Sequence, residues 1–217
     1  ATVIGAPLIQ INPIAGVELP PLDGYQWLVI TSLHGARGLG RLLNEAQLDA
    51  RALAGVRVAA VGPRTEAELA KLGLRADLVP SEHRATALVR DIAQRAKTGE
   101  RALFIGGTLG GDEVCEGLSA HGLHVTRLDV YDTAPRPMST SARRAAACGL
   151  DAVLLYSPSA TRAFASEDID VSNAIIACIG PTTAAVANEA GLDVHIVPET
   201  YSDDGMVSTL IECFNTP

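Results

Sequence analysis

A gapless internal repeat organises this chain and limits the folds that it can adopt. Residues 58–65 and 176–183 both read as an apolar run followed by Gly-Pro, one variable residue and Thr. Both copies continue to a Gly-Leu pair and end on Val-Pro, at 79–80 and at 197–198. This order predicts a strand, a turn that opens a helix, a glycine that ends the helix, and a second strand. Each copy therefore predicts a βαβ unit with parallel strands.

A second pair of segments extends the duplication. Residues 27–30 are an apolar run that ends in two hydroxyl residues, and residues 152–155 lead in a similar way to Ser157. A helical pattern follows each run, and a further apolar run at 102–105 precedes a glycine-rich turn. We therefore expect an α/β protein of two similar lobes, each a small doubly wound parallel sheet with flanking helices.

Two alternating segments, 7–13 and 125–133, are candidates for the connection between the lobes. Each is bounded by proline on at least one side, as an extended strand often is. Two such strands side by side predict a two-stranded linker at which the lobes could open and close. The expected domains are a continuous lobe, 9–132, that includes the linker strands, and a discontinuous lobe made of 1–8 and 133–217.

Composition excludes several classes of protein. The net charge is −8 without a run of Lys or Arg, which argues against a nucleic-acid groove. No apolar stretch approaches the roughly 18 residues of a membrane span. The four cysteines form no Cys-x-x-Cys pair, so we expect a reduced cytoplasmic setting without a disulfide framework or a zinc site. Because no heptad pattern is present, we expect a monomer.

The ends of the predicted strands carry glycines and hydroxyl residues, each just before a helix. In open parallel sheets ligands bind beyond these ends, where free amides and the helix dipole favour an anion. Each residue alone also fits an ordinary role as a helix cap or turn residue. Repeated at every strand end of two facing lobes, they predict a cleft that holds a polycarboxylate. The candidate binding residues are Thr31, Ser32, Gly62, Thr65, Gly106, Gly107, Ser157, Ser159, Thr182 and Thr183.

Tyr131 lies in the second linker segment, where its side chain could face the cleft. A phenol can donate a proton to a reacting group. A tyrosine in a strand more often packs against its neighbours, and the residues alone favour packing. For His34, at the start of a helix, contact with a ligand and a partly exposed structural position both remain open, and the structural position is the simpler interpretation.

Seven short segments match, in order and spacing, the pattern of a known family. They are 7–11, 27–35, 61–65, 130–133, 156–159, 179–184 and 205–207. Over nearly its whole length the chain thereby resembles uroporphyrinogen-III synthases. The resemblance implies two α/β lobes, a two-stranded linker and a substrate cleft between the lobes.

The same resemblance implies an activity. The family cyclises hydroxymethylbilane, a linear tetrapyrrole with many carboxylates, with loss of water and inversion of the terminal pyrrole ring in haem biosynthesis. It is a lyase reaction without a metal or an organic cofactor. By position, Tyr131 matches the linker tyrosine that assists departure of the hydroxyl. The polar residues that match those around the substrate are Ser32, Thr65, Ser157, Ser159 and Thr183.

Two departures from the family pattern leave an alternative open. Relatives usually begin with a further strand and helix, so the discontinuous lobe is expected to lack these elements. Asp112 and Glu113 follow a Gly-Gly pair where relatives often have Arg, and they are expected to weaken attraction for a carboxylate. The alternative is a non-catalytic two-lobed protein that binds an anion or a tetrapyrrole.

Overall fold

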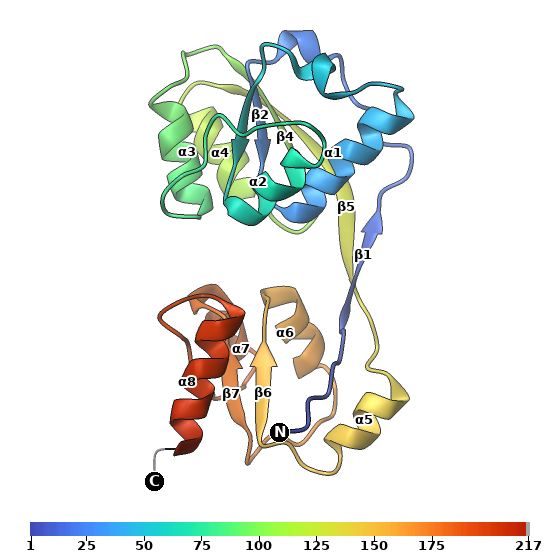
Figure 1. Cartoon of the computed structure of the whole chain (residues 1–217), viewed down its shortest axis with the longest axis vertical. Helices are drawn as coiled ribbons and strands as arrows, with labels where there is room; N and C mark the ends of the chain where they lie inside the picture. The colour runs from blue at the N-terminus through green and yellow to red at the C-terminus, as the bar shows by residue number, and fades with distance from the viewer. Residues whose placement is uncertain (216–217) are drawn as a thin grey trace. The chain divides into compact units, whose positions relative to one another are not determined.

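The structure is a computed structural model that describes residues 1–215, and the chain divides into two compact units (Figure 1). Unit 1 contains Ala1–Gln10 and the chain from Ala134 onward, and unit 2 contains Ile11–Thr133. Each unit has parallel strands flanked by helices, so the predicted α/β class is confirmed. Among the described residues, no helix is both long and apolar enough to cross a membrane.

Unit 2 is built on a sheet whose strand order is β1-β5-β4-β2-β3. Its strands are β1 (Ile9–Pro13), β2 (Trp27–Ile30), β3 (Arg57–Ala60), β4 (Arg101–Gly107) and β5 (His124–Pro135). The pairs β2–β3, β2–β4 and β4–β5 are parallel. The chain moves outward from β2 to β3 and then returns to the other side of β2 to form β4. This reversal makes the sheet of unit 2 doubly wound.

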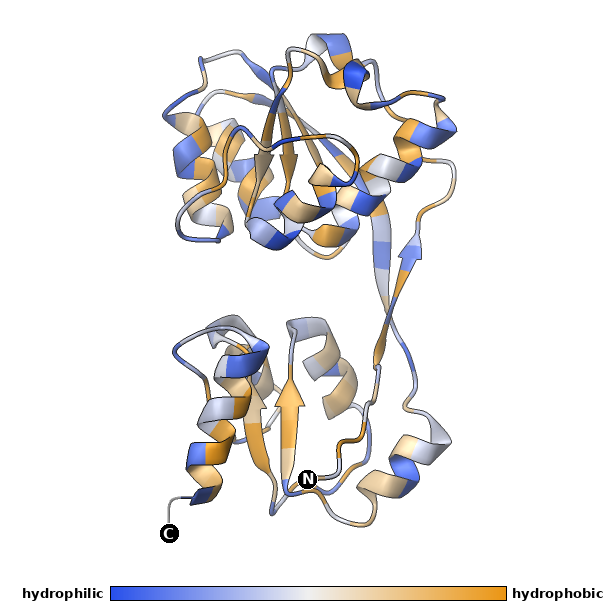
Figure 2. Cartoon of the chain, viewed as in Figure 1, coloured by the Kyte–Doolittle hydropathy of each residue, from blue (hydrophilic) through white to orange (hydrophobic). Residues whose placement is uncertain are grey.

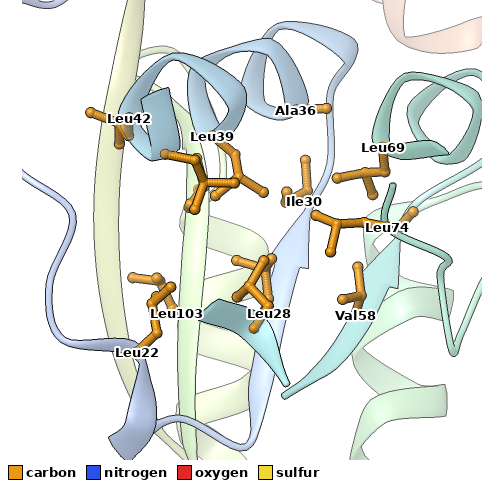
Figure 3. Close-up of a cluster of buried hydrophobic side chains, with 14 of the residues drawn as sticks. Leu22, Leu28, Ile30, Ala36, Leu39, Leu42, Val58, Leu69, Leu74 and Leu103 are labelled. Atoms are coloured by element: carbon orange, nitrogen blue, oxygen red, sulfur yellow. The ribbon is translucent and has the colours of Figure 1, made fainter. Parts of the chain in front are cut away.

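Helices cover both faces of this sheet. They are α1 (Leu33–Glu45), α2 (Pro63–Ala70), α3 (Ala85–Ala93) and α4 (Asp112–Ala120), with short 3-10 turns η1 (Leu22–Gly24) and η2 (Ala50–Leu53). Leu28 and Ile30 pack against α1 and α2 (Figure 3), and Trp27 and Val29 face α3 and α4. Because both faces are covered, β2 is apolar at every position. Full burial of each large side chain contributes about 1.5–3 kcal/mol.

Unit 1 is smaller and has a parallel sheet in the order β6-β7-β8. Its elements are β6 (Ala152–Leu155), β7 (Ile175–Cys178), β8 (Val194–Ile196), α5 (Thr140–Ala146), α6 (Pro158–Ala165), α7 (Pro181–Glu189) and α8 (Asp203–Asn215). Phe164 of α6 packs with Ile176 on one face of the sheet, and Met206 of α8 packs with Ala177 on the other. Figure 2 shows the apolar residues of this unit gathered on the strands and on helix faces.

The internal repeat is visible in both units, with one difference from expectation. The expected second strand forms in unit 1 as β8, but in unit 2 the prediction of a strand at 78–80 is wrong. A single bridge, Ala59 to Leu78, replaces it, because the N–H groups of Asp77 and Leu78 both donate to the carbonyl of Val58. This irregular pairing does not continue as a ladder.

Side chains complete the strand pairing at equivalent positions of the repeat. The Val58 N–H donates to Oδ2 of Asp77 at 2.7 Å, and the Ile176 N–H donates to Nδ1 of His195 at 3.2 Å. Asp77 and His195 align in the repeat, since both lie nineteen residues beyond their partners. A backbone donor that the ladder leaves open is thus satisfied in both units.

Replacement of Asp77 tests this arrangement. Asp77→Ala is expected to lower the free energy of unfolding by about 1–3 kcal/mol, because the buried Val58 N–H loses its acceptor. Asp77→Asn retains a side-chain oxygen and should lose less. Urea unfolding measures both. The control is Glu82→Ala, which removes only an exposed ion pair with Arg90 and should change stability by less than about 0.5 kcal/mol. Equal losses for Asp77→Ala and Glu82→Ala would contradict the assignment.

Candidate functional site

The site in unit 2 lies where the strand order reverses, beyond the carboxyl ends of β2 and β4. Thr31 and Ser32 follow β2 directly, and Gly106 and Gly107 are the last residues of β4. A switch point of this kind is where open parallel sheets bind ligands, because the connections leave in opposite directions and open a crevice. Four of the predicted binding residues therefore come together at the topological switch point of unit 2.

Tyr131 of β5 reaches across this point. Its ring lies on Gly107, where an added Cβ would overlap the ring, and its hydroxyl donates to Oγ of Ser32 at 3.1 Å. The ring also packs against the buried core of the unit. The ring of Tyr131 therefore packs, as the residues alone favoured, and its hydroxyl also reaches the switch point.

Ser32 connects the phenol to the start of α1. It is the N-cap residue of this helix, and its Oγ accepts the N–H of Gly35 at 2.9 Å as well as the hydroxyl of Tyr131. A serine hydroxyl has two acceptor sites and one proton. With both acceptor sites used, the Ser32 proton has no acceptor among the described residues and remains available to a ligand.

His34 lies beside the phenol. The ring centroids of His34 and Tyr131 are 5.5 Å apart, with the planes tilted by 56°. Partial burial lowers the pKa of His34 from 6.5, the nearby Arg37 lowers it further, and Glu68 opposes part of this shift. The imidazole beside Tyr131 is therefore biased toward its neutral form. The sequence alone gave no reason to connect His34 with Tyr131, since 97 positions separate them in the chain.

Gly62 and Thr65 follow β3, the neighbour of β2. Gly62 is the N-cap residue of α2 and has no side chain to cap it, while Pro63 occupies the first turn. Thr65 is only 4% exposed, and its N–H donates to the carbonyl of Gly62. The structure thus places Thr65 inside the first turn of the helix, where it is less accessible than Ser32.

The predicted binding residues of unit 1 lie at the carboxyl ends of β6 and β7. Ser157 caps α6 by accepting the N–H of Ala160 at 3.2 Å, and the hydroxyls of Ser157 and Ser159 are 3.3 Å apart. Thr182 is exposed in the first turn of α7, and Thr183 is 3% exposed. These four residues are brought to one edge of the unit 1 sheet. That this set and the set of unit 2 share one cleft stays a prediction.

A ring covers the Gly-Pro helix start in each unit. His83 lies against Gly62, and Tyr201, which is 53% exposed, lies against Gly180. His83 and Tyr201 occupy equivalent positions of the repeat, 21 residues beyond their glycines. Neither residue was predicted from the sequence, although extension of the repeat alignment beyond 80 and 198 would have paired them.

The described residues contain no group of three or more His, Cys, Asp or Glu side chains arranged to hold a metal ion. A hollow of about 740 Å³ in unit 2 lies between segment 13–19 and the second half of α1. It includes Arg41 and Glu45 but none of the predicted binding residues. The hollow is therefore separate from the switch point.

This is an α/β protein whose parallel sheets present a phenol, hydroxyls and helix starts at the carboxyl ends of their strands. Comparison with known proteins identifies its family. A family model described as uroporphyrinogen-III synthase HemD matches residues 1–208. A uroporphyrinogen-III synthase of Chlorobaculum parvum is 29% identical over 213 residues, which cover 95% of this chain and 87% of that protein.

Further relatives agree with this match. A chloroplastic uroporphyrinogen-III synthase of rice is 30% identical over 201 residues, or 88% of this chain and 64% of that protein. The crystal structure of uroporphyrinogen-III synthetase from Helicobacter pylori has a similar fold, with a TM-score of 0.72 at 16% identity. The match covers 95% of this chain and 91% of that structure. This chain belongs to the uroporphyrinogen-III synthase family. The alternative of a non-catalytic binder is not favoured, since these relatives are named as synthases.

The environment of His34 makes a prediction about its titration. In the folded protein, an NMR titration should show a midpoint for His34 below 6.5, because burial and Arg37 disfavour the imidazolium. In the urea-unfolded chain, the same residue should return toward the ordinary value near ~6.5. A midpoint for the folded protein at or above that of the unfolded chain would contradict the contact described here.

Proposed function

We propose that this chain catalyses the cyclisation of hydroxymethylbilane to the type III tetrapyrrole, with loss of water and inversion of the terminal pyrrole ring. Membership of the synthase family supports this proposal. The single observation that carries it is the phenol of Tyr131, held at the switch point by a hydrogen bond to Ser32.

The reaction begins with departure of a hydroxyl from a pyrrolylmethanol carbon. The pyrrole nitrogen releases electrons toward this carbon as the C–O bond breaks, so one weak acid is sufficient to protonate the leaving oxygen. The hydroxyl of Tyr131 carries a proton that is now donated to Ser32. In the proposed step the phenol turns this proton to the leaving hydroxyl, which departs as water.

Ser32 has a second part in the proposed step. Once Tyr131 has given up its proton, the phenolate oxygen becomes an acceptor beside the Ser32 hydroxyl. Rotation of this hydroxyl reverses the hydrogen bond, so that Ser32 donates to the phenolate. The Gly35 N–H continues to hold Oγ of Ser32 in place. A hydrogen bond to the charged form stabilises that form, which lowers the cost of proton transfer.

Donors at the strand ends are proposed to hold the substrate carboxylates. The overall charge of −8 repels an anion, so binding has to come from local groups. Thr31 in unit 2, and Ser157, Ser159 and Thr182 in unit 1, offer hydroxyls that are at least partly accessible. Arg64, at the exposed start of α2, forms no ion pair within residues 1–215 and adds a cationic group. Holding a flexible chain so that the correct carbon closes the ring is chiefly a matter of orientation.

We further propose that the protein acts as a monomer in the cytoplasm. The acidic surface keeps copies apart through like charge. All four cysteines, Cys115, Cys148, Cys178 and Cys213, are free, which fits a reducing compartment.

Replacement of Tyr131 by Phe tests the proposed function. Tyr131→Phe keeps the ring on Gly107 and removes the proton donor, so the rate of type III formation should fall by about 100-fold. The assay supplies enzymatically made hydroxymethylbilane and separates the type III product from the type I product that forms spontaneously.

Tyr25→Phe is the matched control for this experiment. Tyr25 is buried in the same unit and its hydroxyl donates to Thr126, at the opposite end of the sheet. This variant should retain the wild-type rate. An unchanged rate for Tyr131→Phe would exclude the phenol as the acid, and wild-type protein that yields type I product alone would end the proposal.

A further inference from the structure

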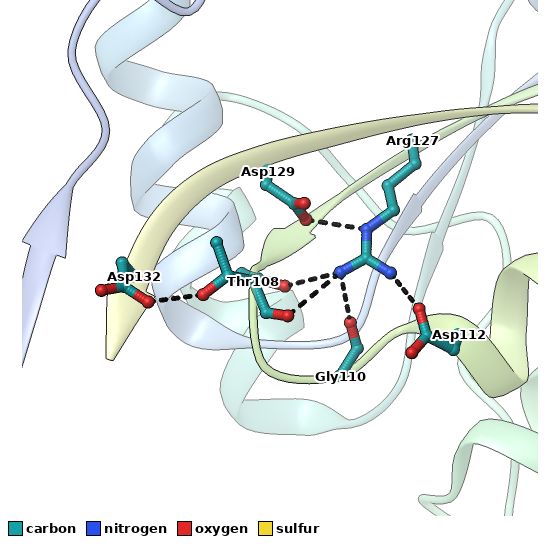
Figure 4. Close-up of polar contacts among 7 residues, drawn as sticks. Thr108, Gly110, Asp112, Arg127, Asp129 and Asp132 are labelled. Atoms are coloured by element: carbon teal, nitrogen blue, oxygen red, sulfur yellow. Dashed lines mark hydrogen bonds and ion pairs between the residues drawn. The ribbon is translucent and has the colours of Figure 1, made fainter. Parts of the chain in front are cut away.

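Arg127 of β5 binds the loop that connects β4 to α4 (Figure 4). Its Nη2 donates to the carbonyls of Gly107 at 3.1 Å, Thr108 at 3.4 Å and Gly110 at 2.9 Å. Its Nε donates to Asp129 at 2.9 Å and its Nη1 to Asp112. One guanidinium therefore joins the end of β4, the loop, the start of α4 and a neighbouring position of β5.

The contacts of Arg127 fix the direction of the loop peptides. Each trans peptide points its carbonyl and the next N–H to opposite sides. Because the carbonyls of Thr108 and Gly110 point at the guanidinium, the N–H groups of Leu109 and Gly111 point away from it. Gly110 and Gly111 have φ values of +117° and +93°, which a residue with a side chain rarely adopts. This backbone shape favours glycine at both positions, and Arg127 binds three carbonyls of the segment that contains them.

The same loop supports Tyr131. Gly107 lies under the phenol ring, the Thr108 N–H donates to the carbonyl of Tyr131 at 3.1 Å, and the Thr108 hydroxyl donates to Asp132. A shift of residues 107 and 108 would therefore move the ring and the backbone of Tyr131. Within residues 1–215 no hydrogen bond or cation–ring contact joins Arg127 to Tyr131, and the polar contacts of Arg127 reach the phenol through this loop.

The ion pair with Arg127 also changes the effect that Asp112 is expected to have on a carboxylate ligand. The sequence led us to expect that Asp112 repels a carboxylate, but its side chain forms an ion pair with Arg127. Arg127 is in turn paired with Asp129, and its side chain is only 27% exposed. Five donors in a rigid planar fork can serve two carboxylates and several carbonyls at once, which the single ammonium of lysine cannot do.

We propose that Arg127 is a positioning residue for the synthase reaction: it holds the 107–111 loop so that the Tyr131 phenol stays aligned at the switch point. This inference rests on the proposed function, and its residue is distinct from the proton donor. It predicts that the guanidinium influences turnover more than stability.

Arg127→Gln and Arg57→Gln form a matched pair for the test. Arg57 belongs to the same unit and also serves an ion pair, with Glu100, and it lies over the ring of Trp27 at the amino end of β3. Arg127→Gln should lower kcat by about 100-fold, with a smaller change in KM, because the phenol is misaligned. Arg57→Gln should lose comparable stability in urea unfolding and keep the wild-type kcat.

Two further measurements separate positioning from general destabilisation. Millimolar guanidinium should restore part of the kcat of Arg127→Ala, whereas Arg127→Lys should recover little. Hydrogen exchange at the amides of residues 107–111 should accelerate in Arg127→Gln and not in Arg57→Gln, and this measurement does not depend on activity.

The outcomes distinguish this inference from the proposed function. If the wild-type protein forms no type III isomer, the proposed function fails while the exchange experiment still tests the loop. If the wild-type protein is active and both Gln variants have the same kcat, the positioning role of Arg127 is overturned. Unchanged exchange at residues 107–111 in Arg127→Gln would also overturn it.

Discussion

The hydrogen bond from Tyr131 to Ser32 joins two strands that are not neighbours in the sheet. β4 lies between β5 and β2, and the phenol crosses it only because the last residue of β4, Gly107, has no side chain. This one close approach brings a proton donor to the switch point and connects it to the start of α1. Because of this close approach, the phenol contacts the hydroxyl of Ser32 and the imidazole of His34. It also places the ring on the loop that Arg127 binds.

Much of the fold of each unit could be predicted because its physical causes are local. The apolar run of β2, buried on both faces, and the Gly-Pro starts of α2 and α7 are visible in the sequence. The failed prediction of a strand at 78–80 had a different cause. Whether an apolar run joins a ladder depends on how its backbone pairs with another segment, and here the N–H groups of Asp77 and Leu78 both donate to the carbonyl of Val58. The helix α3 was not predicted either, since no cap or repeat marks its start.

The candidate site was predictable to the extent that it follows strand ends. Ser32 and Gly107 were identified because both follow buried runs, and the repeat pointed to Gly62 and to the aligned Thr65 and Thr183. That Thr65 and Thr183 are buried inside helix turns could not be predicted from their spacing. His34 and Arg127 depend on contacts with distant segments, so neither could be connected with Tyr131 from spacing alone.

The Tyr131 phenol lies at the switch point because Gly107 has no side chain beneath its ring. The rate of type III isomer formation by a Gly107→Ala variant measures whether turnover depends on this position. An added methyl group would overlap the ring and displace the phenol, so we expect a rate close to that of the variant without the phenol hydroxyl, in a protein that remains folded. A wild-type rate for folded Gly107→Ala would show that turnover does not depend on the described position of the phenol.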